Sequence, residues 1–281
     1  MRIILDNYTR LSNIFGLIER ILDRIGPWLL RSITFSLMIF LWLPMFTMVI
    51  SSFSQTLFSF PPTSLTTDWY VEFLTNDQAI SAIITSLQIG ALATPVSVIL
   101  AVLYSYGFNR YSFRGQRFLQ IILILPLVVP LVITGTALTL FFGLLEINPG
   151  FWPVVIAHII WTVPFTTLVV LPSFIRFNPR LEEASMDLGA SELETFRSIT
   201  FPNVLPGIIA GAVLAFTLSL NEFIFTFFVR DSTTRTLPVF LWNKIRFGLT
   251  PEINAISTLF LISAIIFILI FISVTRIERL L

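Results

Sequence analysis

Six long hydrophobic blocks, separated by polar segments, dominate the pattern of this chain. Each block reaches the ~20 residues that an α-helix needs to cross the hydrocarbon core of a bilayer. The blocks cover residues 32–53, 83–106, 118–143, 151–175, 204–229 and 255–275. Prolines interrupt several blocks, which membrane helices tolerate where neighbouring helices or water satisfy the freed carbonyl groups. The pattern predicts an all-α, polytopic membrane protein whose six spans form one domain over residues 28–281.

A different pattern precedes the first block. Residues 3–25 place hydrophobic side chains on one helical stripe and charged side chains off it. The stripe contains Leu11, Ile14, Phe15, Ile18, Ile21, Leu22 and Ile25. This segment predicts an amphipathic interfacial helix over residues 1–27, which we expect to end at Gly26 and Pro27. Scattered charges and the lack of a small-residue cleavage site argue against a removable signal peptide.

A polar island, residues 178–202, separates the fourth and fifth blocks and holds five of the sixteen acidic residues. Asn178 can cap a helix that begins at Pro179, and Gly189 suits a left-handed helix stop. Ser191 and Glu194 have capping-box spacing for a second helix, which we expect to continue until Pro202. The island therefore predicts a helix, a turn and a helix.

Each helix of the island has an apolar face. The first face holds Leu181, Ala184 and Leu188, and the second holds Leu193, Phe196 and either Ile199 or Thr200. Two short amphipathic helices between membrane spans indicate a docking surface. The alternative is that both helices pack only on their own membrane domain.

The distribution of basic residues predicts the orientation in the membrane. With the N-terminus in the cytoplasm, thirteen Lys and Arg residues fall inside and four fall outside. The four outside are Arg230, Arg235, Lys244 and Arg246. This orientation places both termini and the polar island in the cytoplasm.

Composition narrows the function classes. With 56% hydrophobic residues, 12% charged residues and a mean hydropathy of +0.90, the chain exposes more apolar surface than a water-soluble core can bury. A net charge of +1 argues against a nucleic-acid partner. The absence of cysteine excludes thiol catalysis and cysteine metal sites. Lys244 is the only lysine and lies in no phosphate-binding loop, so ATP-driven work requires another subunit and no cofactor is expected here.

Polar side chains inside the predicted spans are few. Glu222 is the only carboxylate well inside a span, with Asn221 beside it, and such a carboxylate usually faces a bundle interior, a partner or a water-filled path. Glu222 either attracts a cationic substrate in the path, with Asn221 assisting, or fixes helix packing as a protonated or hydrogen-bonded carboxyl group. For His158, the only histidine, we favour a role as a hydrogen-bonded packing residue over a role in proton transfer. No catalytic or metal-binding motif is visible, which disfavours a membrane-embedded enzyme.

Several residues of the island recur in a familiar order: Glu183, Ala184, Ser185, Gly189, Ile199, Phe201 and Pro202. This order resembles the EAA loop of the membrane subunits of binding-protein-dependent ABC importers, from whose commonest pattern Ser185 and Phe201 depart. The resemblance implies a coupling helix that seats in a groove of a cytoplasmic ATPase. The implied ATPase-coupling residues are Glu183, Ala184, Asp187, Gly189, Ala190, Phe196, Ile199 and Pro202.

Other stretches resemble the polyamine (spermidine/putrescine) branch of these permeases. They are residues 60–62, Trp69 with Tyr70, residues 113–130 and residues 210–229. The resemblance implies a type I importer fold in a prokaryotic inner membrane, with a second homologous permease, two ATPases and an extracytoplasmic substrate-binding protein. Asn221 and Glu222 stand where that branch more often has two aspartates, which leaves the cargo open.

A polyamine or another small organic cation is the favoured cargo. Related branches carry ferric iron, thiamine, opines, or oxyanions such as sulfate and molybdate. An ion-driven secondary transporter is a rival interpretation, but it has no need of a capped polar island facing an ATPase.

Overall fold

The computed structural model describes the backbone of residues 2–56, 61–62, 64–248 and 250–277, and it does not describe the side chains of 2–25, 267, 268 and 270–277. Helices are the regular structure of the described residues, apart from one isolated bridge between Ser54 and Leu65. The expected all-α class is confirmed. The chain divides into two units, Met1–Thr67 and Asp68–Leu281, which are described separately.

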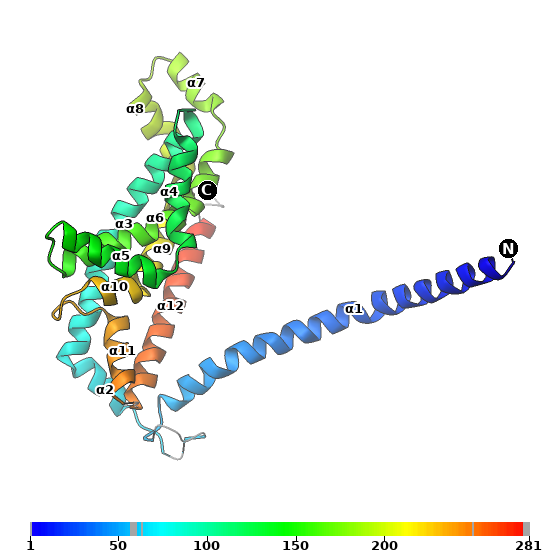
Figure 1. Cartoon of the computed structure of the whole chain (residues 1–281), viewed down its shortest axis with the longest axis horizontal. Coiled ribbons are helices and arrows are strands. Elements are labelled where there is room, and N and C mark those ends of the chain that lie inside the picture. The colour runs from blue at the N-terminus through cyan, green and yellow to red at the C-terminus, as the bar shows by residue number, and fades with distance from the viewer. Residues whose placement is uncertain (1, 57–60, 63, 249, 278–281) are drawn as a thin grey trace. The chain divides into compact units, whose positions relative to one another are not determined.

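Unit 1 contains one long helix, α1 (Arg2–Ser51), drawn in blue in Figure 1. The expected end of a helix at Gly26 and Pro27 is wrong, because α1 continues through Pro27 and Pro44. A proline inside a helix removes one backbone hydrogen bond and can kink the helix without ending it. The segment Gly26–Ser51 is long and apolar enough to cross a membrane. The amphipathic stripe of residues 3–25 lies outside the described side chains, so its interfacial position stays a prediction.

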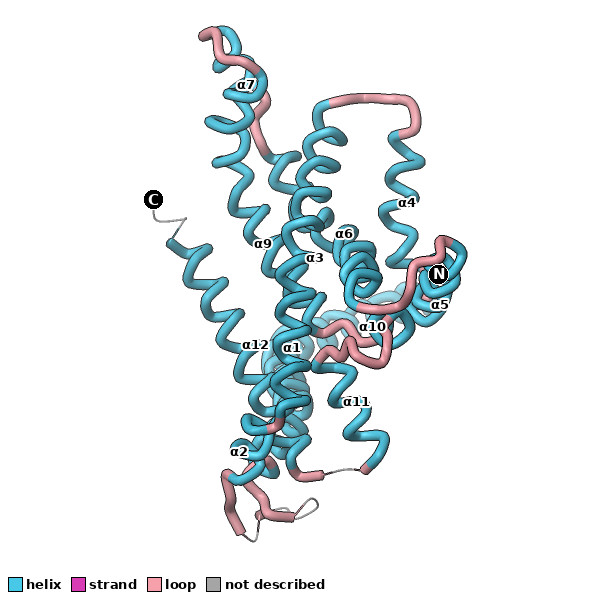
Figure 2. Tube along the Cα trace, turned by 90° about the vertical axis from the view of Figure 1, so that its left-hand side faces the viewer, coloured by secondary structure: helices cyan, strands magenta, loops and turns pink. Residues whose placement is uncertain are grey.

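Unit 2 is a helical bundle organised around α3 (Asp77–Arg110), α6 (Phe151–Arg176) and α9 (Phe201–Leu220), which pack against one another (Figure 2). The remaining helices are α2 (Asp68–Thr75), α4 (Gln116–Val128), α5 (Leu131–Leu144), α7 (Arg180–Asp187), α8 (Glu192–Thr195), α10 (Ile224–Val229), α11 (Leu237–Phe247) and α12 (Glu252–Ile277). In both views α7 lies at one end of this unit and α2 at the other, with α10 between them (Figures 1 and 2). The polar island therefore projects from one end of the bundle.

Small and hydroxyl-bearing residues bring the central helices together. Ser97 of α3 and Thr162 of α6 share a buried hydrogen bond of 2.7 Å between their hydroxyl oxygens. Gly211 of α9 faces α6 so closely that an added Cβ would lie 2.7 Å from Val170 Cγ2 and 3.2 Å from Thr166 Cγ2. Membrane helices associate through such close packing and interhelical hydrogen bonds, because lipid provides little hydrophobic driving force between them.

Replacing Gly211 with alanine should destabilise the bundle, by about 1–3 kcal/mol for an overpacked site. Val170 is β-branched and has little rotamer freedom with which to yield. Gly107→Ala on α3 is the matched control, since nothing lies within 4 Å of the added Cβ. Thermal unfolding of the purified protein in detergent should show a lower Tm for Gly211→Ala and an unchanged or higher Tm for Gly107→Ala. Equal Tm values would contradict the close contact.

The predicted third span is not one straight helix. α4 and α5 meet at an angle of 112°. Pro130 explains the break, because a proline disfavours helical geometry in the residue before it, and Val129 has an extended conformation with φ −76° and ψ 133°. Among the described residues, four helices are long and apolar enough to span a membrane, or five if α4 and α5 form one broken span. The predicted sixth span corresponds to α12, whose described apolar part, Glu252–Ile266, falls below that length.

The predicted fifth span is also interrupted. α9 ends at Leu220, and α10 begins at Ile224, so residues 221–223 form a break (the helix break). At its other end, α9 does not begin after a stop at Pro202. A π-helical turn, Phe196–Thr200, joins α8 to α9, so that Glu192–Leu220 forms one helical segment of 29 residues. The expectation that Pro202 ends the second helix of the island is wrong, since proline is tolerated in the first turn of a helix.

Candidate functional site

The turn between α7 and α8 is built around Gly189. Its φ of +92° lies in the left-handed region that glycine adopts at little cost. The Gly189 N–H donates to Met186 O (2.9 Å), and the Ala190 N–H donates to Ser185 O (3.2 Å). These two bonds form a Schellman motif, which satisfies carbonyl groups at the end of α7. The predicted helix stop at Gly189 is confirmed.

The helix starts follow the predicted capping pattern with one shift. Asn178 Oδ1 accepts a hydrogen bond from the Arg180 N–H (3.1 Å), but α7 begins at Arg180 and not at Pro179. Ser191 and Glu194 form the expected capping box at the start of α8. The backbone N–H and hydroxyl of Ser191 both donate to Glu194 Oε2 at 2.8 Å, which lowers the pKa of Glu194. The turn is therefore preorganised by its own side chains.

The island, residues 178–202, is hereafter called the coupling loop after the role that its resemblance implies, and its outer surface is apolar at several points. Leu188 is 90% exposed and Leu193 is 76% exposed, although both are large aliphatic residues. Glu183, Ala184, Asp187, Gly189 and Pro202 are also exposed, whereas Ala190, Phe196 and Ile199 are half-buried. These leucines are exposed on the polar island and not on a hydrophobic block, where lipid would cover them, and apolar surface in such a place is typical of an interaction site.

The inner side of the coupling loop is anchored by one buried acid. Glu182 is only 4% exposed. It forms an ion pair with Arg110 Nη1 at the end of α3, and it accepts a hydrogen bond from Thr200 Oγ1 in the π-helical turn. We call these three residues the Arg110 cluster. It connects the coupling loop to two of the three central helices, α3 directly and α9 through the turn.

Aromatic packing reinforces the Arg110 cluster. The Tyr106 ring of α3 lies edge-on to the rings of Phe196 and of Phe174 in α6, with distances between ring centroids of 5.2 Å and 6.2 Å. Asn109 Nδ2 donates to Phe174 O (3.0 Å). A cavity of about 380 Å³, lined in part by Tyr106, Asn109 and Arg110, lies beside the cluster. The ends of α3 and α6 and the coupling loop therefore meet at one place.

Within the coupling loop, α7 and α8 are joined by a further contact. Ser185 Oγ lies 3.0 Å from Thr195 Oγ1, and Thr195 is buried. Ser185 is one of the two departures from the commonest EAA pattern, and here its hydroxyl makes the hydrogen bond between the two helices. The loop thus behaves as one packed element rather than as two separate helices.

The helix break places Glu222 in the protein interior. Glu222 is 6% exposed, and it lies in the break between α9 and α10 rather than within a continuous helix. Its Oε1 accepts from the Phe225 N–H (2.7 Å), and its Oε2 accepts from the Thr226 N–H (2.9 Å) and from Thr226 Oγ1 (3.2 Å). The carboxylate thus satisfies donors at the start of α10 that would otherwise be unpaired inside the bundle. This geometry favours the packing alternative for Glu222.

Asn221 lies beside Glu222 but is exposed. Its Nδ2 donates to Thr217 O (2.8 Å), which leaves the amide oxygen of the side chain without a hydrogen bond among the described residues. Thr217 is also exposed and contributes to a groove of about 290 Å³ between α3 and α9, with Thr94 and Phe216. The polar surface nearest the helix break therefore belongs to Asn221 and not to Glu222.

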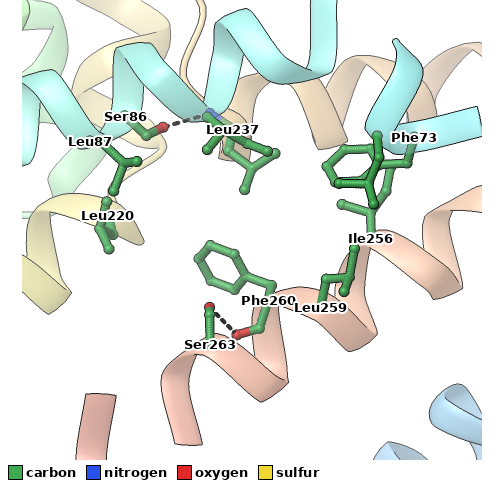
Figure 3. A pocket seen from close by; sticks show the side chains of 11 residues that line it. Phe73, Ser86, Leu87, Leu220, Leu237, Ile256, Leu259, Phe260 and Ser263 are labelled. Carbon is green, nitrogen blue, oxygen red and sulfur yellow. Dashed lines mark hydrogen bonds between the residues drawn. The ribbon is translucent and has the colours of Figure 1, made fainter. Parts of the chain in front are cut away.

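A separate cavity of about 290 Å³ lies between α2, α3, α11 and α12 and is almost wholly apolar (Figure 3). Its two hydroxyl groups are engaged, because Ser86 Oγ accepts from the Leu237 N–H (2.8 Å) and Ser263 Oγ donates to Phe260 O (2.8 Å). It is therefore a poor site for a polar cargo. Over the part of the chain that the structure describes, no group of three His, Asp or Glu side chains could hold a metal ion.

Sequence reasoning missed the partners of Glu182. Arg110 lies far from Glu182 in the sequence, and Thr200 lies in a later turn of the loop. No local spacing therefore links either residue to Glu182. The available indication of a buried partner was that Glu182 belongs to neither apolar face of the island. The half-buried Phe196 was singled out, but its partner Tyr106 was not.

The sequence matches known transport proteins over most of its length. Residues 93–281 match the family described as "Binding-protein-dependent transport system inner membrane component". The chain is 36% identical over 230 residues to the putrescine transport system permease protein PotI of Escherichia coli K12, covering 79% of this chain and 82% of PotI. It is 30% identical over 230 residues to the spermidine/putrescine transport system permease protein PotC of the same organism, covering 82% of this chain and 87% of PotC.

Solved structures show the same fold. A bacterial ABC transporter involved in the import of the acidic polysaccharide alginate matches with a TM-score of 0.74 at 16% identity, covering 89% of this chain and 96% of that chain. An amino acid ABC transporter solved with histidines matches with a TM-score of 0.58 at 16% identity, covering 75% and 99%. With the family match over residues 93–281, these findings establish that the chain belongs to the inner membrane components of binding-protein-dependent transport systems.

Proposed function

We propose that this chain is the membrane subunit of an ATP-driven importer in which the coupling loop receives the movement of a cytoplasmic ATPase. The observation that carries the proposal is the two-sided nature of the loop. Its outer side exposes Leu188 and Leu193, and its inner side is fixed to the bundle through the buried Glu182. If the loop only packed on its own membrane domain, we would expect Leu188 and Leu193 to be buried and Glu182 to be exposed, which is the opposite of the observed arrangement.

The partners follow from what the chain lacks and from its family. It has no phosphate-binding loop, so two ATPase subunits would bind and hydrolyse ATP. A second homologous permease would complete the pathway, and an extracytoplasmic binding protein would deliver the cargo. A related solved structure, a bacterial alginate ABC transporter in complex with an alginate pentasaccharide-bound periplasmic protein, supports that arrangement. Both termini and the coupling loop would lie in the cytoplasm, as the basic residues indicate.

The helical segment Glu192–Leu220 provides a physical route for coupling. It begins within the coupling loop and ends at the helix break. A displacement of α8 therefore moves the far end of α9, where Asn221 lies, because a continuous helix transmits movement along its axis. Alternating access would result if ATP-driven closure of the ATPases shifts this segment and α3 together.

A polyamine or another small organic cation is the cargo that the relatives favour, since PotI and PotC are named for putrescine and spermidine. Asn221 would contact the cargo, because its side chain is exposed, whereas Glu222 would act from within by holding the helix break. Ferric iron, thiamine, opines and the oxyanions remain the competing cargoes.

Asn221 and Glu222 should respond differently to substitution. Asn221→Ala should leave assembly and ATP hydrolysis intact and change polyamine uptake several-fold, the usual effect of losing one polar contact. Glu222→Gln should reduce the yield of assembled protein, because an amide has only one oxygen for the donors that the carboxylate accepts. Size-exclusion chromatography and uptake measured in parallel check both outcomes. Normal assembly of Glu222→Gln with weaker uptake of cations alone would instead place Glu222 in the path.

Reconstitution tests the proposed function directly. The chain would be expressed with its partner permease and ATPase, placed in proteoliposomes, and supplied with the binding protein and labelled putrescine or spermidine. Uptake should require ATP, the ATPase and the binding protein together. Concentrative uptake that persists without the ATPase and follows an ion gradient would identify a secondary transporter.

A further inference from the structure

His158 of α6 connects the two sides of the helix break. It is 1% exposed and is among the largest fully buried side chains of the described residues. Its Nδ1 lies 2.7 Å from Ser219 Oγ in the last turn of α9, and its Nε2 lies 2.9 Å from Thr226 Oγ1 in α10. A single ring on one helix therefore holds the end of one segment and the start of the next.

The hydrogen-bond geometry identifies a consistent arrangement of donors. If Ser219 Oγ donates to Nδ1 and Nε2–H donates to Thr226 Oγ1, then the Thr226 hydroxyl is free to donate to Glu222 Oε2 at 3.2 Å. Nε2 also lies 3.4 Å from Glu222 Oε2, so the carboxylate is close to both donors. Each hydrogen is used once, and no buried polar atom of the four residues lacks a partner.

The bonds of His158 add side-chain connections to a break that has few backbone hydrogen bonds. Residues 221–223 lie outside a helix, and among the described hydrogen bonds their N–H groups bond back to α9 only at Asn221 (to Thr217 O, 3.2 Å) and Glu222 (to Ser219 O, 3.3 Å). The Glu222 carboxylate bonds to the start of α10 and the Glu222 N–H to Ser219 O of α9 (3.3 Å), whereas the single His158 ring bonds to a side chain on each side of the break. Loss of the imidazole would leave the Ser219 and Thr226 side chains without their shared partner and would weaken the connection between the two helix ends.

We propose that His158 is a positioning residue that sets the exposure of Asn221 by tying the end of α9 to α10, and this rests on the proposed role of Asn221 in the path. The imidazole works as a fixed two-sided hydrogen-bond partner and neither contacts cargo nor carries a proton across the membrane. A histidine that only stabilised the packing of the bundle would leave the exposure of Asn221 unchanged when it is replaced. A positioning histidine sets where the neighbouring residue on the break lies.

The natural absence of cysteine makes a direct measurement possible. Asn221→Cys creates a single thiol in this chain, and its rate of reaction with a small polar thiol reagent in the assembled transporter reports the exposure of that position. The rate would be compared between the protein with His158 and the His158→Leu variant, which keeps side-chain bulk and removes both hydrogen bonds. Thr166→Val is the matched control, since Thr166 is buried on the same helix but bonds only to Thr162 O of its own helix.

His158→Leu should change the labelling rate by about tenfold, as expected when buried hydrogen bonds that hold one conformation are lost. Thr166→Val should change it less than about twofold. His158→Gln, which keeps a donor and an acceptor but does not titrate, should recover part of the original rate and of uptake. Recovery of neither, with normal assembly, would overturn the positioning role in favour of a role for the ring's proton.

Milder variants keep the test informative if His158→Leu fails to assemble. Ser219→Ala and Thr226→Val each remove one side of the connection, and each should alter the labelling rate in the same direction. Unchanged labelling in both would overturn the proposal. Because labelling needs neither ATP nor cargo, it separates failure of this inference from failure of the proposed importer function, which would show as absent ATP-dependent uptake in the unmodified protein.

Discussion

Replacing Gly189 with proline is expected to abolish ATP-driven uptake while the chain still inserts and folds. Gly189 has φ +92°, whereas proline fixes φ near −65°. Proline also lacks the N–H that donates to Met186 O at the end of α7. The turn between α7 and α8 would have to reorganise, and the exposed Leu188 and Leu193, which lie on either side of it, would change position relative to each other. Uptake in proteoliposomes should fall below about a tenth of the original value, with ATP hydrolysis no longer stimulated by the binding protein.

Gly115 provides a matched control for this substitution. It has φ +96° and, like Gly189, no atom within 4 Å of an added Cβ, but it lies between α3 and α4. Gly115→Pro therefore introduces comparable backbone strain outside the coupling loop. Uptake should survive better in Gly115→Pro than in Gly189→Pro. Equal loss in both variants, or continued uphill uptake by Gly189→Pro, would contradict the role of the coupling loop.

Substitutions in the Arg110 cluster are expected to have the second largest effect, and the two acid–base partners should not be equivalent. The Glu182 side chain is 5% exposed and the Arg110 side chain is 26% exposed. Arg110→Leu leaves a buried carboxylate with only Thr200 as a partner, which should cost about 3 kcal/mol. Glu182→Gln leaves an arginine that can reach water and keeps an acceptor for Thr200, so it should cost about 1 kcal/mol.

Both variants should weaken coupling in the same order as they weaken stability. The Tm of the purified complex and the ratio of cargo imported to ATP hydrolysed are the two measurements. Glu192→Gln is the control, because Glu192 is an exposed acid in the same loop that makes no contact with Arg110 or Thr200 among the described ion pairs and hydrogen bonds. If Arg110→Leu lowers the Tm but leaves the transport ratio unchanged, the cluster stabilises the fold without transmitting movement.

The features predicted correctly from sequence are those encoded by local spacing. The hydrophobic blocks identify a membrane protein because no compact soluble fold can bury them, and the family match agrees. The stop at Gly189 and the capping box of Ser191 and Glu194 are also local, since the interacting atoms belong to neighbouring residues. For such features, a residue type at a fixed spacing is nearly sufficient to predict the local structure.

Features that depend on proline or on distant partners were harder to predict. Pro27 and Pro202 were expected to end helices, but each lies inside or at the start of one, whereas Pro130 does mark a sharp break. A proline permits all three outcomes, and tertiary packing selects one. The ion pair of Arg110 with Glu182 has no sequence pattern, because it forms only when α3 and the coupling loop meet.

The helix break is another feature that local spacing did not predict. Glu222 was recognised as unusual from its depth in a hydrophobic block, but the block itself gave no indication that α9 ends at Leu220. Both alternatives for Glu222 assumed a continuous helix. In the structure the carboxylate caps α10, and this makes the exposed Asn221 the better candidate for contact with cargo. The roles of both residues stay predictions.

Cross-linking from position 188 tests the central proposal most directly. Leu188→Cys introduces the only thiol of the chain at a highly accessible site of the coupling loop, and a photoreactive group attached there would be activated in the assembled transporter. Phe247→Cys is the control, because Phe247 is similarly exposed at the end of α11, which lies toward the opposite end of unit 2 (Figure 1). The proposal predicts a cross-link from position 188, and not from position 247, to a subunit that carries a phosphate-binding loop. A cross-link from position 188 only to lipid or to this chain itself would contradict it.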